Sequence, residues 1–226
     1  MCDNARVDRS QGYNRGMRKA LHILAGLPAL GLPYIGLCPY GWYVAAALAL
    51  GGLWFAYSLK PSHSRWLRYI SKPADRNRGV ITGLRGYAVV IVILLLLWYP
   101  LGFVDAAALR YVMFGWLALA WADGLAGLLG PSPRQGGTVP WNRHKTWWGF
   151  FGAVIGAATA YAVAFLAPWP GVPLAELRWP LATGVVTALV VAVLESLKLR
   201  IDDNYLVGLG APLAVLTFHL LAGYVI

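Results

Sequence analysis

Long apolar stretches alternate with short polar ones along most of the chain. Each stretch is near the roughly 20 residues that a helix needs to cross a bilayer, and charged, proline-rich or glycine-rich segments separate them. We expect a tight break at Pro100 to Gly102, because the apolar region there is too long for one helix. The pattern predicts an all-α, polytopic membrane bundle of about seven transmembrane helices, near residues 19–36, 41–59, 82–103, 106–130, 147–167, 179–198 and 205–226.

Composition supports the membrane class. Hydrophobic residues make up 59% of the 226 positions and charged residues 12%, whereas soluble domains are about 45–50% apolar and about 25% charged. Because the spans leave no room for a separate soluble domain, residues 1–226 are expected to form a single transmembrane domain.

The basic residues predict an orientation. Of the 19 lysine and arginine residues, all except Arg110 and Arg178 lie on one predicted side of the membrane. Loops rich in lysine and arginine stay in the cytoplasm, so the N-terminus with its tail (1–17), the basic loop (60–81) and the loop 131–146 are predicted to be cytoplasmic. The net charge of +10 is then mainly a topology signal. Nucleic acid is not an expected partner, and a homodimer remains an option.

Acidic residues are few, and four of those on this predicted cytoplasmic side stand beside or inside the spans. The chain has 9 in total. An ionisable group at mid-membrane costs at least about 2.5–3.5 kcal/mol, so such residues beside or inside spans are functional candidates. The candidates are Asp123 near the end of one span, Glu195 inside the next to last, and Asp202 and Asp203, which stand with Asn204 between two apolar stretches.

The placement of Glu195 leaves two readings open. Glu195, Lys198 and Asp202 are spaced i, i+3 and i+7, which places them on one face if the helix continues that far. The alternative is a purely structural ion pair between Glu195 and Lys198.

Basic and hydroxyl-bearing residues occupy the same predicted side. Arg143, Lys145 and Thr146 precede a helix start, where unpaired amides and the helix dipole favour anions. Arg18, Lys19 and His22 lie together on the first helix, where His22 either contacts phosphate or is hydrogen-bonded inside the bundle. We expect no catalytic or binding role for two other histidines. His63 is predicted to lie in an interfacial amphipathic segment, and His219 is predicted to lie in the core.

Together these residue types indicate phosphoryl or nucleotidyl transfer to a lipid on the cytoplasmic face. Carboxylate ligands suit Mg²⁺, which usually binds one or two carboxylates together with substrate phosphates. Lysine and arginine neutralise a transferring phosphoryl group, because catalysis of this transfer is mostly positioning and electrostatics.

Four short motifs occur in order along the chain. They are Arg18-Lys19-x-x-His22-x-x-x-Gly26, Asp123-x-x-Ala126-x-x-x-Gly130, Lys145-Thr146, and Glu195 followed by Asp202-Asp203-Asn204. This series resembles the CTP-dependent polyprenol kinases, which include dolichol kinase, phytol kinase and a CTP-dependent diacylglycerol kinase, over about residues 18–212. The related phosphatidate cytidylyltransferases share the Asp and Lys segments, but their His-Gly-Gly-x-x-Asp-Arg-x-Asp element is absent from this chain.

The resemblance implies a membrane-embedded kinase that transfers the γ-phosphate of CTP to the hydroxyl of a lipid alcohol. It implies Mg²⁺ held by Asp123, Asp202 and Asp203, and a hydroxyl oriented or deprotonated by Glu195. The expected phosphate-binding residues are Arg18, Lys19, His22, Arg143, Lys145, Thr146 and Asn204. One departure is Trp148, which stands where the family's Lys-Ser/Thr-x-Glu-Gly box has Glu.

Two other functions stay open from the sequence. A cytidylyltransferase would make a CDP-lipid from a phosphorylated lipid and release pyrophosphate. A lipid transporter would use the acids as an ion relay, although the acids gather on one face and do not cross the membrane.

Overall fold

The computed structural model describes residues 14–98, 108–130, 137–169, 181–199 and 202–221. Helices form most of this part of the chain, so the predicted helical class is confirmed. The break at Pro100 to Gly102, most of the N-terminal tail and the end of the last span lie outside the described residues. The elements are α2 (Arg15–Leu24), η1 (Leu27–Gly31), α3 (Leu32–Gly36), α4 (Gly41–Ser58), η2 (Pro61–His63), α5 (Arg65–Ile70), α6 (Pro73–Arg78), α7 (Thr82–Ile93), η3 (Leu94–Trp98), α8 (Ala108–Leu129), β1 (Thr138–Val139), β2 (Asn142–Thr146), α10 (Trp147–Tyr161), η5 (Ala162–Leu166), α11 (Leu181–Ser196) and α12 (Asp203–Leu221).

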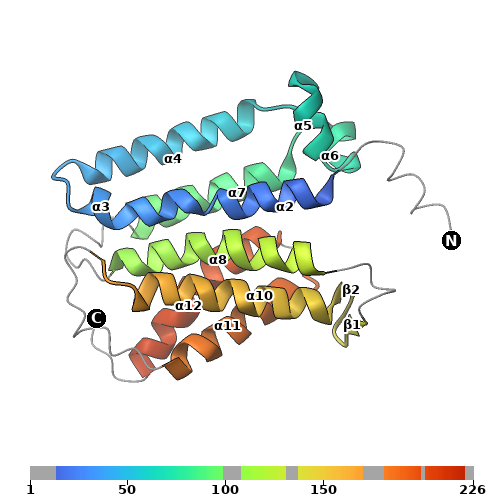
Figure 1. The fold of residues 1–226 in the computed structure, drawn as a ribbon. Coiled ribbons are helices and arrows are strands. Elements are labelled where there is room, and N and C mark those ends of the chain that lie inside the picture. The colour runs from blue at the N-terminus through green and yellow to red at the C-terminus, as the bar shows by residue number, and fades with distance from the viewer. Residues whose placement is uncertain (1–13, 99–107, 131–136, 170–180, 200–201, 222–226) are drawn as a thin grey trace.

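Three described helices are long and apolar enough to cross a membrane. They cover Ala108–Leu129, Trp147–Leu166 and Asp203–Leu221, and two shorter apolar helices cover Thr82–Leu96 and Ala182–Ser196. The long helices run roughly alongside one another in a bundle (Figure 1). The count of seven spans and the side of the N-terminus stay predictions.

Helix α8 forms the centre of the bundle. It packs against α10, α12 and α2, and most of its side chains are buried. The approach of α10 is close because Gly152 and Gly156 lie one turn apart on the face that meets α8. A Cβ atom at Gly152 would lie 2.7 Å from the Leu125 carbonyl oxygen, and one at Gly156 would meet the Trp121 backbone. Small residues spaced in this way let helices pack backbone to backbone in membranes.

The predicted first span is not a single helix. α2 ends at Leu24, and η1 and α3 complete the segment. Pro28 and Pro33 occupy the first turns of these two short helices, and a proline cannot donate the amide hydrogen bond that would continue the preceding helix. The segment therefore consists of three short helices, and of these only α2 reaches the candidate site residues.

The basic loop 60–81 is folded. It contains η2, α5 and α6, and Ser64 caps α5 by accepting a hydrogen bond from the Leu67 amide at 3.0 Å. The turn after α6 uses Gly79 at φ +66°, a conformation that favours glycine. Asp75 of α6 is buried and accepts a 2.6 Å hydrogen bond from the Thr82 hydroxyl, which fixes α6 against the start of α7.

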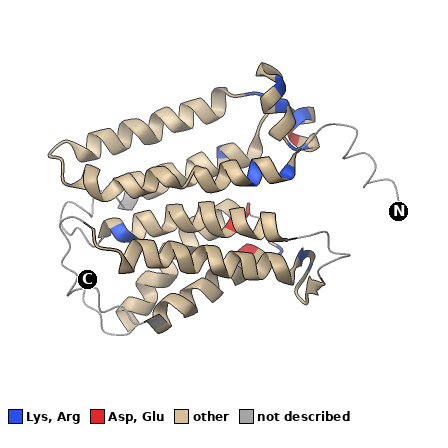
Figure 2. Ribbon diagram, in the orientation of Figure 1, with Lys and Arg blue, Asp and Glu red and all other residues tan. Residues whose placement is uncertain are grey.

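Lysine and arginine residues gather at one end of the bundle, in α5, α6, β2 and the start of α2 (Figure 2). Arg110, at the start of α8, lies at the opposite end. This is the distribution of charge that the sequence predicts among the described residues.

Candidate functional site

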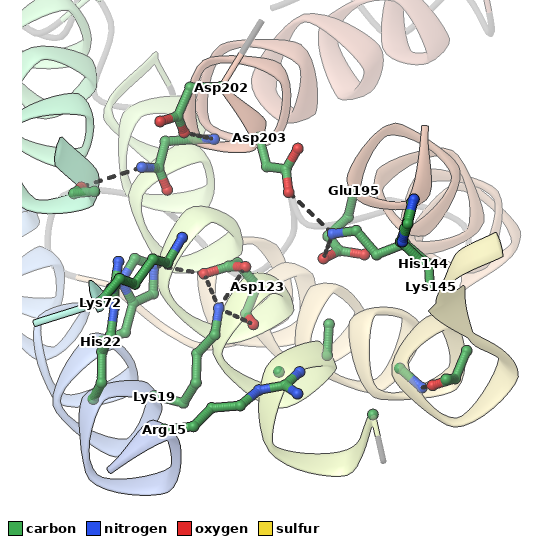
Figure 3. A pocket seen from close by; sticks show the side chains of 18 of the residues that line it. Arg15, Lys19, His22, Lys72, Asp123, His144, Lys145, Glu195, Asp202 and Asp203 are labelled. Atoms are coloured by element: carbon green, nitrogen blue, oxygen red, sulfur yellow. Dashed lines mark hydrogen bonds and ion pairs between the residues drawn. The ribbon is translucent and has the colours of Figure 1, made fainter. Parts of the chain in front are cut away.

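A polar cavity of about 360 Å³ opens at the basic end of the bundle. Its walls come from α2, α8, β2 and α10 and from the junction of α11 with α12, so segments far apart in the sequence meet there (Figure 3). Nearly all of the predicted site residues line it, namely Arg18, Lys19, His22, Asp123, Lys145, Thr146, Glu195, Asp202, Asp203 and Asn204.

The first charged cluster joins α2 to α8. The Lys19 ammonium donates to both carboxylate oxygens of Asp123 at 2.7 Å, and to the Asp123 backbone carbonyl at 3.2 Å. His22 Nε2 lies 3.2 Å from Asp123 Oδ2 and 3.2 Å from the Leu119 carbonyl oxygen. Both neighbours of Nε2 are acceptors, so this nitrogen carries the proton in the arrangement that satisfies them.

The glycines of α8 make room for this cluster. A Cβ atom at Gly127 would lie 2.7 Å from Lys19 Cδ and 2.9 Å from Lys19 Cγ, and one at Gly124 would overlap Ile23. Gly127 therefore admits the aliphatic stem of Lys19, which crosses α8 to reach Asp123, and Gly124 admits Ile23.

The second charged cluster joins β2 to α11 and α12. The Lys145 ammonium donates to Glu195 Oε1 at 2.6 Å and to Asp203 Oδ2 at 3.0 Å. The Glu195 side chain is only 4% exposed, whereas that of Asp203 is 42% exposed. Burial by itself would lower the pKa of Lys145, but the Glu195 and Asp203 carboxylates outweigh burial and raise the pKa above that of an ordinary lysine.

A short β-hairpin holds Lys145 in place. β1 and β2 pair antiparallel, and the Asn142 side-chain amide donates to the Ser196 carbonyl at 2.9 Å at the end of α11. Trp141 Nε1 donates to the Ser196 hydroxyl at 2.9 Å. Because the hairpin is tied to the end of α11, Lys145 and Glu195 are held facing each other.

Helix α10 begins at the cavity. The Thr146 hydroxyl caps it by accepting from the Gly149 amide at 3.1 Å, and both residues line the cavity. The positive end of the helix dipole therefore faces the space between the two clusters, which favours a bound anion.

Asp202 and Asn204 shape the start of α12. Asp202 accepts from the Asn204 amide at 2.9 Å, and the Asn204 side-chain amide donates to the Gly83 carbonyl at 3.2 Å on α7. Within the described part of the chain Asp202 forms no ion pair, in contrast to Asp123 and Asp203.

The reading that placed Glu195, Lys198 and Asp202 on one helical face is wrong. α11 ends at Ser196, so Lys198 and Asp202 are not on the same helix as Glu195. The structural alternative, a Glu195–Lys198 pair, is also not found: Glu195 bonds to Lys145, and the side chain of Lys198 is exposed.

Two predicted positions lie outside the cavity. Arg143 is exposed and is not among the residues that line it, so its phosphate-binding role stays a prediction. Trp148, at the position of the family's Glu, is 58% exposed and does not line the cavity either. The interpretation of His219 as a core residue is confirmed, because it is fully buried and its Nδ1 lies 2.7 Å from the Tyr111 hydroxyl.

Sequence reasoning missed several residues of the cavity wall, including Arg15, Lys72, Thr82 and His144. Lys72 belongs to the basic loop and had been interpreted only as a topology signal. Burial, followed by the charge of Arg18, lowers its pKa below that of an ordinary lysine. Lys72 lines the cavity because the loop is folded back against the bundle. Asp75 of this loop is hydrogen-bonded to Thr82 of α7, and the buried carboxylate of Asp75 lies 3.7 Å from Arg18 Nη1.

The donor chemistry of the cavity fits Mg²⁺ bound together with an anion. Among the described residues no three His, Cys, Asp or Glu side chains are grouped as a ready metal site. Mg²⁺ rarely uses such a cage, because it keeps waters and takes one or two carboxylates plus substrate phosphates. Asp202, without an ion pair to a described residue, is the carboxylate best placed to serve, with Asp123 and Asp203 nearby in the same cavity.

Comparison with known proteins gives no match: no family model, no curated protein and no solved structure is significantly similar to this chain. The resemblance to the CTP-dependent polyprenol kinases accordingly rests on the four short motifs alone.

Proposed function

We propose that this protein is a membrane-embedded kinase that transfers the γ-phosphate of CTP to the hydroxyl of a lipid alcohol with Mg²⁺, on the cytoplasmic side of a seven-helix bundle. The observation that carries the proposal is the pair of lysine–carboxylate clusters, Lys19–Asp123 and Lys145–Glu195–Asp203, that line one cavity at a helix start. The choice of CTP, and of a polyprenol, phytol, dolichol or diacylglycerol type of alcohol, follows the motif resemblance.

The charge balance of the cavity suits a nucleotide bound with a divalent cation. Five lysine and arginine side chains and four aspartate and glutamate side chains line it. A nucleotide alone would meet four carboxylates, and a metal ion alone would meet five cations. When both bind, the phosphates can replace carboxylates at the lysines while the released carboxylates face the metal, so neither set of charges is left unpaired.

The proposed roles follow from these contacts. Lys145, Lys19 and Arg18 bind phosphates, and the start of α10 at Thr146 receives one phosphate through its amides. Asn204 and His22 complete the polar wall. Asp202 would hold Mg²⁺ together with the phosphates, and Asp123 or Asp203 would supply a second carboxylate when a phosphate takes its place at the lysine. The bound ion would neutralise charge on the transferring phosphoryl group. Glu195 positions Lys145 and stays a candidate for orienting the hydroxyl.

The kinase is favoured over a transporter because the ionisable residues gather at one end of the bundle. Among the described residues, Arg110 in the first turn of α8 and His219 in the last turn of α12 lie at the far end, and neither lines the cavity. An ion relay needs titratable groups along the whole path. A cytidylyltransferase remains the other chemistry that the same cavity allows, and the product distinguishes the two.

The test is a transfer assay on purified protein with Mg²⁺ and CTP labelled at the γ-phosphate, with prenols, diacylglycerol and phosphatidic acid as acceptors. A kinase carries label into the organic phase with an alcohol acceptor. Pyrophosphate released only with a phosphorylated lipid would identify a cytidylyltransferase, and no consumption of nucleotide would refute both enzymes.

Variants connect the activity to this cavity. Lys145→Ala and Asp202→Asn are expected to abolish transfer, while Lys198→Ala, an exposed lysine outside the cavity, is expected to keep it. Full activity in both cavity variants would remove the proposed site.

A further inference from the structure

A second cavity adjoins the first and differs from it in chemistry. It has a volume of about 550 Å³ and lies between α2, α4, α5 and α7, with walls that include Phe55, Leu59, Trp66, Leu67, Leu84 and Tyr87. Arg18, His22 and Gly83 line both cavities, so the apolar groove and the polar site adjoin at these three residues.

The walls of this groove are apolar along its length. Leu67 of α5 is buried and faces it together with Leu84 of α7. Tyr87 presents its apolar ring to the groove, because its hydroxyl is already hydrogen-bonded: it donates to the Ala25 carbonyl at 3.0 Å and accepts from Trp116 Nε1 at 2.8 Å. Arg18, His22 and Ser64 also line the groove with polar groups, and most of the remaining wall is apolar.

The groove is also open to its surroundings. Phe55 on α4 is 55% exposed and Trp66 on α5 is 50% exposed, although both line it. α4 and α7 pack together, and α5 lies at the basic end of the bundle beside the start of α2 (Figure 1). An apolar chain can therefore enter sideways between α4 and α5, at the level where the charged end of the protein begins.

We propose that this groove binds the hydrocarbon chain of the alcohol substrate and delivers its hydroxyl to the shared mouth at Arg18 and His22. This inference rests on the proposed kinase function. The occupant is an amphiphile with one polar end, because the groove is apolar along its walls and meets charged side chains where it joins the polar cavity. The hydroxyl then enters the polar cavity from the side of α2, where Arg18 and His22 lie.

The direct test is photolabelling of the protein in nanodiscs with a long-chain primary alcohol that carries a diazirine near the end of its chain. We expect labelled peptides from α4, α5 and α7, and loss of that labelling when unlabelled alcohol is added. Labelling that falls on α10 to α12 would overturn the proposal. So would equal labelling by a diazirine phosphatidylcholine that the alcohol fails to displace, because the groove would then hold bilayer lipid only.

A matched pair of variants tests the same site through kinetics. Leu84→Trp fills the groove, and Leu50→Trp adds the same ring at an exposed position of α4 that does not line it. Overpacking of an apolar site lowers affinity about 5–150-fold. The KM for a long-chain alcohol should therefore rise at least about fivefold in Leu84→Trp, with little change for a short-chain alcohol or in Leu50→Trp.

The two proposals fail in different ways. If the probe labels the groove and is displaced by alcohol, yet no γ-phosphate is transferred, the kinase function is wrong and the chain-binding groove stands. If transfer proceeds while the probe labels other helices and Leu84→Trp keeps the KM of the parent, the groove is wrong and the kinase stands. The labelling pattern of the unsubstituted protein decides the matter if Leu84→Trp fails to fold.

Discussion

Removal of the Lys145 charge should destabilise the protein mainly through Glu195. In Lys145→Met the aliphatic stem is retained and the ammonium is lost, so the buried Glu195 carboxylate loses its 2.6 Å partner. Loss of one partner from a buried ion pair costs about 3–5 kcal/mol. The Asp203 contact adds little, because that side chain is 42% exposed and exposed pairs contribute about 0–1 kcal/mol.

The second substitution should restore most of this loss. In Lys145→Met with Glu195→Leu the uncompensated charge is gone, and apolar replacement of a buried pair is often close to neutral. We therefore expect the double variant to lie within about 1–2 kcal/mol of the parent, which makes the coupling energy at least about 1–2 kcal/mol. Transfer activity should be absent in both variants, because neither has the proposed phosphate-binding ammonium.

The assay is reversible unfolding in mixed micelles, with the free energy measured for the parent, the two single variants and the double variant. Lys198→Met is the matched control, and its exposed side chain predicts a change within about 0.5 kcal/mol. Two results would refute the reasoning: a Lys145→Met loss no larger than that of the control, or a double-variant loss equal to the sum of the two single losses.

Four further predictions concern other parts of the cavity and bundle. Gly156→Ala pushes a Cβ against the α8 backbone and should lower the free energy of unfolding by about 1–3 kcal/mol. The control Gly51→Ala, with no described atom within 4 Å of its Cβ, should be neutral or stabilising. Equal losses in the two variants would contradict the close packing of α8 and α10. Gly127→Ala should displace Lys19 and lower turnover by more than about tenfold without unfolding the protein, and parent-level turnover would count against the Lys19 contact. The pKa of Lys72 is lowered, so its positive charge is available to bind phosphate below that pKa and is lost as pH rises through it, earlier than for an ordinary lysine near about 10.4. Lys72→Arg should therefore keep nucleotide affinity nearly constant up to about pH 10. If nucleotide affinity falls with pH in the same way in the parent and in Lys72→Arg, Lys72 does not bind phosphate. Removal of Mg²⁺ should weaken nucleotide binding about 5–150-fold, with the same factor for Mg²⁺ on removal of nucleotide, and equal dissociation constants with and without chelator would refute the charge balance of the cavity.

The convergence of the site residues was predictable because charge is rare in this chain. With 9 acidic residues and long apolar stretches, each carboxylate beside a span stands out, and alternate spans bring their ends to the same side. Asp123, Glu195 and Asp203 could be selected on these grounds, and all three line one cavity. Helix ends were predicted well for α4, where residues 41–59 were expected and Gly41–Ser58 is found.

The pairing of these residues could not be predicted in the same way. Which carboxylate meets which lysine depends on the rotation of helices about their own axes and on turns that spacing does not define. Lys145 finds Glu195 because the Asn142 side chain ties the hairpin to the end of α11, a contact between segments with no shared pattern. Lys72 was missed for a related reason, since a basic loop gives the same topology signal whether it is extended or folded back over the cavity.

The charged clusters also impose an order on how the chain matures. Lys19 and Asp123 are separated by 104 positions, and Lys145 is separated from Glu195 by 50 and from Asp203 by 58. During synthesis Lys19 therefore has no partner until α8 is made, and Lys145 has none until α11 and α12 are made. Before those last helices are synthesised, the residues of the cavity carry an excess of positive charge. A nascent chain that stalls before α11 would expose these unpaired cations to anionic lipid headgroups.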